Sequence, residues 1–186
     1  MAISSPQPLP IRQKALQVQG SGKYAVSDSV SLPPLTPTGV LVRTISVAVN
    51  PIDAKIVDYS ASAGCIGGSD FAGYIVAIGP AVQRQLSIGD RACGIVRGCN
   101  AAIPGDGAFC EYLVAESSFL LQIPDGIPFE NAVGLGTAIV SVGMSLYQSI
   151  GLPFPSLDGR GGRGGYALVY GGSTSCGTLA IQMLKL

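Results

Sequence analysis

The most constraining feature of this sequence is a succession of three local patterns over residues 166–186. Residues 166–170 (YALVY) are apolar or aromatic and predict a buried strand. The Gly-rich stretch 171–177 follows at once, and residues 178–186 predict the start of a helix. A strand, a Gly-rich turn and a helix in this order open a dinucleotide-binding fold, whose turn offers backbone N–H groups to a pyrophosphate. An ordinary turn between a strand and a helix fits equally well, because GGSTSCG is not the complete G-x-G-x-x-G pattern.

The region before residue 128 has the pattern of many short strands. Glycine and proline (26 and 13 of 186 residues) interrupt it throughout, as in proteins with many turns. Predicted strands cover residues 14–18, 24–30, 40–49, 74–78, 92–96, 107–114 and 119–123. We therefore expect a polar lead-in over residues 1–13 and a compact, barrel-like β domain over residues 14–127.

The spacing of apolar residues becomes helical over residues 128–150, where we expect one or two connecting helices. Residues 151–165 contain two prolines and the tract DGRGGRGG, which we interpret as a surface linker. An RGG tract that binds RNA is the alternative, but such tracts carry many more repeats and a basic balance. The linker leads into residues 166–186, the start of the region with the Gly-rich turn.

Charge and apolar content exclude several classes of partner. Lys plus Arg and Asp plus Glu number 11 each, which gives no electrostatic reason to expect nucleic acid or an anionic membrane as partner. The first dozen residues lack an apolar leader, and no run approaches the roughly 20 apolar residues that a spanning helix needs. The five cysteines include no CxxC pair. We therefore expect a cytoplasmic protein with free thiols.

The sequence contains no histidine. Ser-His-Asp and Cys-His nucleophilic arrangements are therefore excluded, and the commonest zinc ligand is missing. We expect no bound metal. Hydride transfer is a better candidate reaction than hydrolysis, because a cofactor performs that step itself.

Three polar residues stand where chemistry could occur, each beside a simpler structural role. Lys55 in the stretch NPIDAK follows a predicted strand and could reach a phosphate, a ribose or a developing enolate. The alternative is a helix capped by Asp53, with Lys55 solvated. Asp70 suits a turn in which its carboxylate accepts from backbone amides. Ser141 lies within the predicted helix, where a serine usually bonds its own helix's carbonyl.

Six stretches together carry a family resemblance. In chain order they are NPIDAK, GGSDFAGYIVAIGPAV, IGDRACG, GAFCEYLV, IPDGIPFENAVGL and ALVYGGSTSCGTLAIQMLK. This series resembles the medium-chain dehydrogenase/reductase superfamily, which implies a GroES-like β domain followed by a Rossmann-type α/β domain. Zinc alcohol dehydrogenases carry Cys and His ligands where this chain has Asn50-Pro51 and Ser69-Asp70, so the resemblance is to zinc-free members. The turn YGGSTSCG is similar to that of fungal trans-acting enoyl reductases, which serve polyketide and polyketide–peptide synthases.

The resemblance implies an NADPH-dependent reduction and assigns residues to it. Ile52, Asp53, Ala54 and Lys55 match the stretch that borders the nicotinamide, and Ser173, Thr174, Ser175 and Cys176 match the phosphate-binding turn. A helical segment lining the substrate pocket corresponds to Val142, Gly143, Met144, Ser145, Leu146, Tyr147, Gln148 and Ser149. Ser141 stands where the family has a hydroxyl residue near the reacting centre. The implied substrate is an α,β-unsaturated thioester on an acyl carrier domain of a polyketide synthase, with Lys55 and Ser141 as candidate catalytic residues.

The resemblance also implies missing structure, because only the first βα unit of the Rossmann-type domain lies within residues 1–186. We therefore expect a fragment or truncated product, or a chain completed by a partner or by self-association. Two other functions stay open. One is a non-enzymatic remnant that docks on a synthase or acyl carrier, and the other is a quinone-type reductase of the same superfamily.

Overall fold

The computed structural model describes residues 8–155 and 165–186, which fall into two compact units. The first unit covers Met1–Gly136 and the second Thr137–Leu186. The boundary thus falls within a helix, a few residues after the end of the predicted β domain. Most of the predicted linker, with its RGG-like tract, lies outside the described residues.

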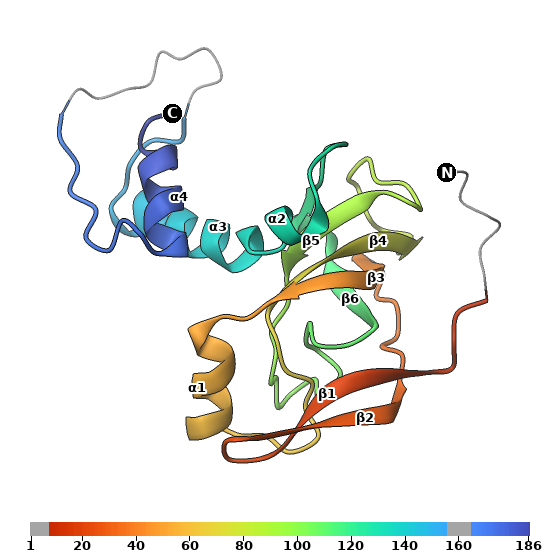
Figure 1. Ribbon diagram of the computed structural model, residues 1–186. Helices are drawn as coiled ribbons and strands as arrows, with labels where there is room; N and C mark the ends of the chain where they lie inside the picture. The colour runs from red at the N-terminus through yellow and green to blue at the C-terminus, as the bar shows by residue number, and fades with distance from the viewer. Residues whose placement is uncertain (1–7, 156–164) are drawn as a thin grey trace. The chain divides into compact units, whose positions relative to one another are not determined.

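Antiparallel strands form the core of the first unit (Figure 1). Five of them form one sheet in the order β6-β3-β4-β5-β7, and β1 and β2 form a separate two-stranded sheet. The bounds are β1 Arg12–Gly20, β2 Lys23–Ser31, β3 Gly39–Ala48, β4 Asp70–Ile78, β5 Arg91–Ile95, β6 Tyr112–Glu116 and β7 Leu120–Gln122. Every predicted strand of this region therefore has a counterpart, although β4 begins earlier and β6 later than the sequence predicts.

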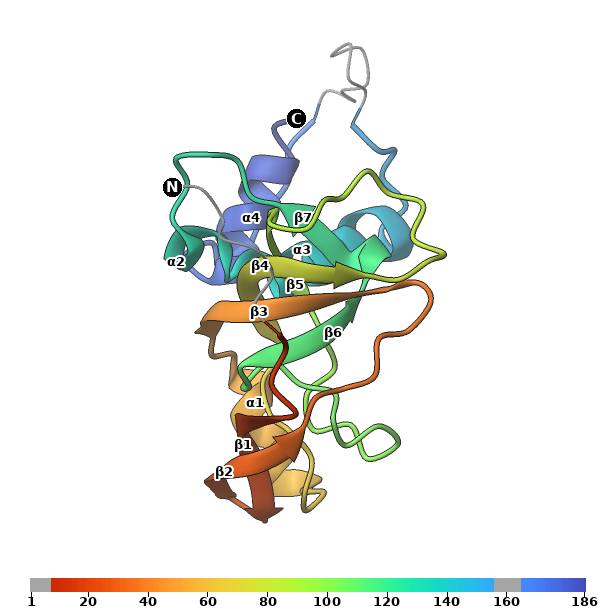
Figure 2. The same cartoon turned by 90° about the vertical axis from the view of Figure 1, so that its right-hand side faces the viewer.

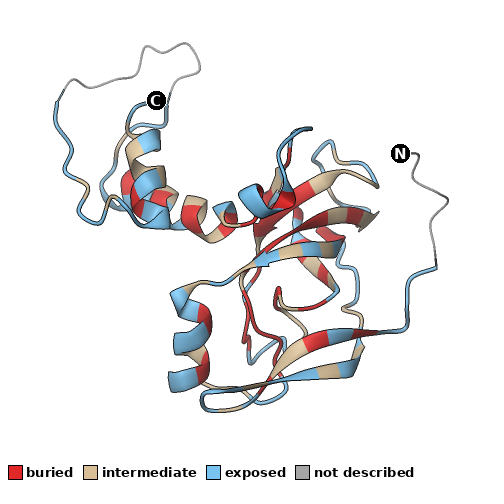
Figure 3. Cartoon of the chain, in the orientation of Figure 1, coloured by how far each residue is buried: buried red, intermediate tan, exposed pale blue. Residues whose placement is uncertain are grey.

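Strand β3 is an inner strand of this sheet, because β4 and β6 pair with its two edges. Its first four residues are buried, and its second half alternates between exposed and half-buried positions. Phe71 and Ile75 on β4 and Leu113 on β6 pack with Val40 and Val42 of β3 in one apolar cluster. Figure 3 shows the buried residues gathered along these strands. Burial of β-branched and aromatic side chains on this sheet drives its formation.

The two sheets contact each other without closing into a barrel. Isolated bridges join Ala15 to Cys110 and Gln17 to Ile66, so β1 crosses two loops of the larger sheet. Helix α1, Pro51–Tyr59, lies beside the β1–β2 turn, where Gly22 N–H donates to Val57 O at 3.0 Å. The view in Figure 2 shows the β1–β2 pair and α1 together at one end of this unit. The barrel-like β domain is thus a pair of open sheets.

The helical pattern over residues 128–150 is present as three consecutive helices. They are α2 Phe129–Ala132, α3 Leu135–Gly143 and the π-helix η2 Met144–Ser149. A short 3-10 turn, η1 Ser117–Phe119, precedes β7. The stretch Phe129–Ser149 has the length and mean hydropathy (1.2) of a spanning helix, contrary to the sequence-based expectation, with 39% of its window buried. Core helices of soluble proteins pass the same test, so one such helix is weak evidence for a membrane span.

The prediction of a strand over residues 166–170 is wrong. These residues adopt no strand, and Tyr166, Leu168 and Tyr170 are 108%, 95% and 100% exposed. A strand needs a neighbour to accept and donate its ladder hydrogen bonds, and no strand among the described residues lies beside this segment. The helix after it does form, as α4 Ser175–Met183.

Candidate functional site

Helix α1 begins with a well-defined cap that the sequence-based interpretation misplaced. Asn50, not Asp53, is the N-cap residue, with extended backbone angles, and Pro51 occupies the first helical position. Asp53 is the third helical residue, and its Oδ2 accepts from the backbone N–H of Asn50 at 2.7 Å. This reciprocal arrangement is that of a capping box, in which an acidic side chain satisfies a free N–H at the helix start. The order Asn-Pro-x-Asp carries that signal in the sequence.

Asn50 also ties the helix to the sheet. Its side-chain Nδ2 donates to Asp70 Oδ2 at 2.9 Å, and Asp70 is the first residue of β4. The second oxygen of Asp53, Oδ1, accepts from Ser69 Oγ at 3.0 Å. Two side-chain hydrogen bonds thereby join residues 50–53 to residues 69–70, and the bond from Asn50 N–H to Asp53 holds the first turn of α1 itself. Asp70 therefore belongs to a buried network and not to a turn.

Both carboxylates of this network are removed from solvent, since Asp53 is 4% and Asp70 0% exposed. Their donors here are an amide, a backbone N–H and a hydroxyl, which compensate part of the cost of burial. Burial, with a smaller contribution from the charge of Asp70, raises the pKa of the Cys93 thiol to about 11. Gly136 of α3 packs closely against this network. A Cβ at this position would lie 2.8 Å from Asp70 Oδ1 and would clash with Gly94 O.

The backbone carbonyl of Asp53 belongs to a second set of polar contacts. The Tyr24 hydroxyl donates to the Asp53 carbonyl at 3.2 Å and lies 3.4 Å from Cys99 Sγ. Burial, together with the hydrogen bond to Cys99, raises the pKa of the Tyr24 hydroxyl. Cys99 itself has a φ of 56°, the only non-Gly residue described with a left-handed backbone. Sequence reasoning missed this contact because its residues are 75 positions apart.

The other predicted residues of α1 point outward. Lys55 and Ala54 are exposed and Ile52 is 44% exposed. Among the described residues, Lys55 makes no hydrogen bond or ion pair. Lys55 is therefore available to a ligand on the solvent side of α1, whereas the carboxylate of Asp53 is buried and hydrogen-bonded.

The Gly-rich turn in the second unit has the local geometry of an anion site. Gly171 has a φ of 81°, and Thr174 caps α4 by accepting from Gly177 N–H at 3.0 Å while donating to Gly171 O at 2.8 Å. A Cβ on Gly177 would lie 2.8 Å from the Gly172 Cα and clash with Gly171 O. The third glycine of dinucleotide-binding turns serves the same close packing.

A phosphate fits the start of α4 by its chemistry. The first backbone N–H groups of a helix have no partner within the helix, and its dipole favours an anion there. Ser173, Ser175 and Cys176 are exposed around this start, whereas the hydroxyl of Thr174 is used by the turn itself. The residues present therefore fit the pyrophosphate of a dinucleotide through backbone N–H groups, with hydroxyl donors from Ser173 and Ser175.

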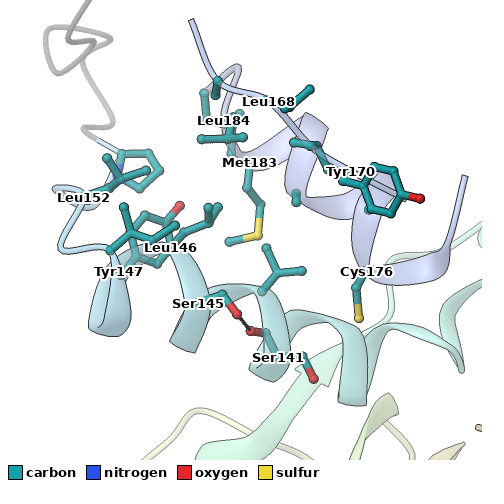
Figure 4. A pocket seen from close by; sticks show the side chains of 18 of the residues that line it. Ser141, Ser145, Leu146, Tyr147, Leu152, Leu168, Tyr170, Cys176, Met183 and Leu184 are labelled. Atoms are coloured by element: carbon teal, nitrogen blue, oxygen red, sulfur yellow. Dashed lines mark hydrogen bonds between the residues drawn. The ribbon is translucent and has the colours of Figure 1, made fainter. Parts of the chain in front are cut away.

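Ser141 lines a cavity of about 860 Å³ within the second unit (Figure 4). Its hydroxyl makes no hydrogen bond among the described residues, and it is Ser145, one turn later, whose Oγ donates to the Ser141 carbonyl at 2.8 Å. The structural role expected for Ser141 is thus taken by Ser145. Cys176 and Thr174 line the same cavity.

The predicted substrate segment is divided among three environments. Val142, Ser145, Leu146 and Tyr147 line this cavity. A smaller hollow of about 320 Å³ is lined by Gly143, Met144, Tyr147, Gln148 and Phe154. Ser149 lines neither. Each hydrogen-bonded ring of a π-helix contains one more residue than that of an α-helix, so these side chains point in different directions.

The predicted residues therefore fall into two groups. Ile52, Asp53, Ala54 and Lys55 belong to the first unit, and Ser141 and the phosphate turn belong to the second. Within the second unit the structure brings Ser141, Thr174 and Cys176 to one cavity. Among residues 8–155 and 165–186 no group of three or more Cys, Asp or Glu side chains is placed to hold a metal ion.

Comparisons with known proteins agree with this division. The alcohol dehydrogenase GroES-like domain family matches residues 36–125. The trans-enoyl reductase caaB of Aspergillus niger is 40% identical over 184 residues, which cover 96% of this chain and 50% of that protein. Further curated relatives, 38% to 42% identical, are also trans-enoyl reductases. The chain spans about half the length of these relatives.

Solved structures show the same fold. An alcohol dehydrogenase superfamily protein from Novosphingobium aromaticivorans superimposes with a TM-score of 0.76 at 23% identity, over 93% of this chain and 50% of its own. A mycobacterial protein complexed with NADPH has a TM-score of 0.60 at 20% identity, over 77% of this chain and 43% of its own. The chain therefore belongs to the medium-chain dehydrogenase/reductase superfamily, with a GroES-like domain, the opening unit of a Rossmann-type domain, and a sequence similar to half of a trans-enoyl reductase.

Proposed function

We propose that this chain contributes one half of a trans-acting enoyl reductase of a polyketide or polyketide–peptide pathway. The observation that carries the proposal is the identity of 38% to 42% with curated trans-enoyl reductases over nearly the whole chain. The substrate would be an α,β-unsaturated thioester on an acyl carrier domain of the synthase. NADPH would be the reductant, and when bound it would supply a hydride to the β-carbon of that thioester.

The chain's own residues would hold the two ends of the cofactor. The turn before α4 would bind the pyrophosphate through backbone N–H groups, with Ser173 and Ser175 donating from their exposed hydroxyls. The exposed residues at the start of α1, Ile52 and Lys55 among them, would border the nicotinamide. The network of Asn50, Asp53 and Asp70 supports this role because it fixes the first turn of α1 against the sheet.

Lys55 and Ser141 are the proposed catalytic residues. Electrons of the C=C bond move toward the thioester oxygen when the β-carbon is reduced, and hydrogen-bond donors at that oxygen lower the barrier. Lys55 carries a free ammonium, and Ser141 a hydroxyl without a partner among the described residues. The α-carbon then takes a proton, which water can supply.

The chain alone is expected to bind NADPH weakly or not at all and to reduce no enoyl thioester. Dinucleotides lie across the crevice between two halves of a parallel sheet, and the described residues of the second unit contain no strand pair. Calorimetric titration of a monodisperse sample with NADPH tests this directly. Micromolar binding with turnover by the chain alone would contradict it.

The function itself is tested by supplying the half of a trans-enoyl reductase that this chain does not match. The assembled pair should oxidise NADPH when an enoyl thioester is present and not when a quinone replaces it. In the assembled pair, Lys55→Ala should lower enoyl reduction at least ~10-fold, about 1.4 kcal/mol of barrier. Lys14→Ala, which removes an exposed lysine on β1, is the matched control. An assembled pair that binds NADPH but reduces only the quinone would sink the proposal.

A further inference from the structure

The β1–β2 hairpin holds α1 by hydrogen bonds to backbone carbonyls of the helix, and two of these bonds lie at the end of the helix. Ser21 Oγ donates to Asp58 O at 2.8 Å, and Gly22 N–H donates to Val57 O at 3.0 Å. The last four carbonyls of an α-helix have no N–H partner within the helix. These two bonds therefore satisfy free carbonyls, and capping explains them.

A third bond from the hairpin reaches the first turn of α1, where capping does not explain it. The Tyr24 hydroxyl of β2 donates to the carbonyl of Asp53 at 3.2 Å, and Asp53 is the third helical residue. A carbonyl at this position ordinarily accepts from the N–H four residues later within the helix. The oxygen has a second lone pair for Tyr24, so this bond adds a constraint to a carbonyl that the helix already satisfies.

Two neighbours hold the Tyr24 side chain in place. Its ring lies against Gly67, where a Cβ would be 2.6 Å from the Tyr24 hydroxyl oxygen and would clash. Cys99 Sγ lies 3.4 Å from the same hydroxyl, and the N–H of Cys99 donates to Ile66 O at 2.7 Å. The left-handed backbone of Cys99, with a φ of 56°, persists only where its surroundings fix it. The position of the Tyr24 hydroxyl is therefore determined by residues outside α1.

Asp53 is thus held through two different groups. Its carboxylate accepts from the Asn50 N–H and from Ser69 Oγ, and its backbone carbonyl accepts from Tyr24. Burial, followed by the hydrogen bond to Cys99, raises the pKa of the Tyr24 hydroxyl, so this group remains a donor at neutral pH. Lys55 follows Asp53 by two positions and is exposed, so the constraint on the Asp53 backbone also fixes where Lys55 leaves the helix.

We propose that Tyr24 is a positioning residue that sets, through the Asp53 carbonyl, where the start of α1 places Lys55. This inference rests on the proposed function, in which Lys55 donates toward the thioester oxygen. Tyr24 itself contacts neither substrate nor cofactor. A displacement of about 1 Å in a reacting site can lower a rate 10²-fold, whereas one neutral hydrogen bond contributes little to stability. Loss of the Tyr24 hydroxyl should therefore affect catalysis more than folding.

The first measurement uses the chain alone. Tyr24→Phe removes the hydroxyl and keeps the ring beside Gly67. Tyr74→Phe is the matched control, because Tyr74 is also half-buried in the first unit and its hydroxyl makes no hydrogen bond among the described residues. Hydrogen exchange of the amides of residues 55–57 should speed up at least ~3-fold in Tyr24→Phe and stay unchanged in the control. Unchanged exchange in Tyr24→Phe would overturn the proposal, whatever the activity of the assembled pair.

The second measurement uses the kinetics of the assembled pair. Tyr24→Phe should lower kcat for the enoyl thioester at least ~5-fold and change KM less than about 2-fold, and Tyr74→Phe should change neither. The double variant Tyr24→Phe/Lys55→Ala should be no slower than Lys55→Ala alone, because the positioned group is then absent. An unchanged kcat in Tyr24→Phe, or two losses that multiply in the double variant, would overturn the proposal. An unsubstituted pair that reduces no enoyl thioester would contradict the proposed function instead, and the exchange measurement would still decide whether Tyr24 holds the start of α1.

Discussion

Both units of this chain contain apolar segments typical of strands. These segments form paired strands in the first unit but not in the second. In the first unit each of the seven strands pairs with at least one other strand. In the second, the segment 166–170 has an equally apolar composition and no partner among the described residues. The difference teaches that an apolar run becomes a strand only where a neighbour supplies its hydrogen bonds.

The largest contrast concerns apolar side chains. Phe71 on β4 is 0% exposed within the main cluster, and Leu168 is 95% exposed. Phe71→Ala should lower the free energy of unfolding by about 3–5 kcal/mol, because it leaves a cavity in the packed sheet. Leu168→Ala should change it by less than about 0.5 kcal/mol. Urea denaturation of both variants measures the pair, and equal losses would contradict the contrast.

The next effect concerns the polar network that fixes α1. Asn50→Ala removes the donor that Asp70 Oδ2 receives at 2.9 Å inside the first unit. A buried carboxylate that loses a donor should cost about 1–3 kcal/mol of unfolding free energy. Asn131→Ala, at an exposed asparagine of α2, is the matched control and should be close to neutral. Thermal unfolding of the two variants compares them. If Asn50→Ala were as stable as the control, the network would not support the helix.

The smallest effect concerns the cap of α4. Thr174→Ala removes the hydroxyl that accepts from Gly177 N–H at 3.0 Å. Loss of such a cap should destabilise the helix locally by about 1 kcal/mol. Ser173→Ala next to it removes an exposed hydroxyl with no role in the cap. Hydrogen exchange of the Gly177 amide should speed up in the first variant only, and an equal change in both would remove Thr174 from the cap.

Much of the fold followed from local patterns in the sequence. The short runs between glycines and prolines that became β1–β3 and β5, and the helical spacing after Pro128, predicted elements within a few residues of their observed bounds. The start of β4 was missed because Asp70 looks like a turn residue. In the structure its buried carboxylate accepts from the side-chain amide of Asn50, 20 positions earlier in the chain. The failed strand over residues 166–170 shows the limit, since the ladder partner of a strand is not part of its own sequence.

The candidate site was less predictable than the fold. The Gly-rich turn and the helix after it were predicted from local sequence, but the cap by Thr174 and the close packing at Gly177 were not. The contacts of Asn50 with Asp70 and of Tyr24 with Cys99 join residues 20 and 75 positions apart. No periodicity connects such pairs, so only the folded chain reveals them. The roles of Lys55 and Ser141 stay predictions that the assembled pair must test.

Residue-resolved hydrogen exchange on the unmodified chain tests the central contrast most directly. Opening of the paired strands β3 and β4 requires disruption of the packed sheet, whereas residues 166–170 have no ladder to break. We predict that amides in the middle of β3 and β4 exchange at least ~1,000-fold more slowly than those of residues 166–170. Comparable protection of both regions would contradict it, because the second unit would then already hold a completed core.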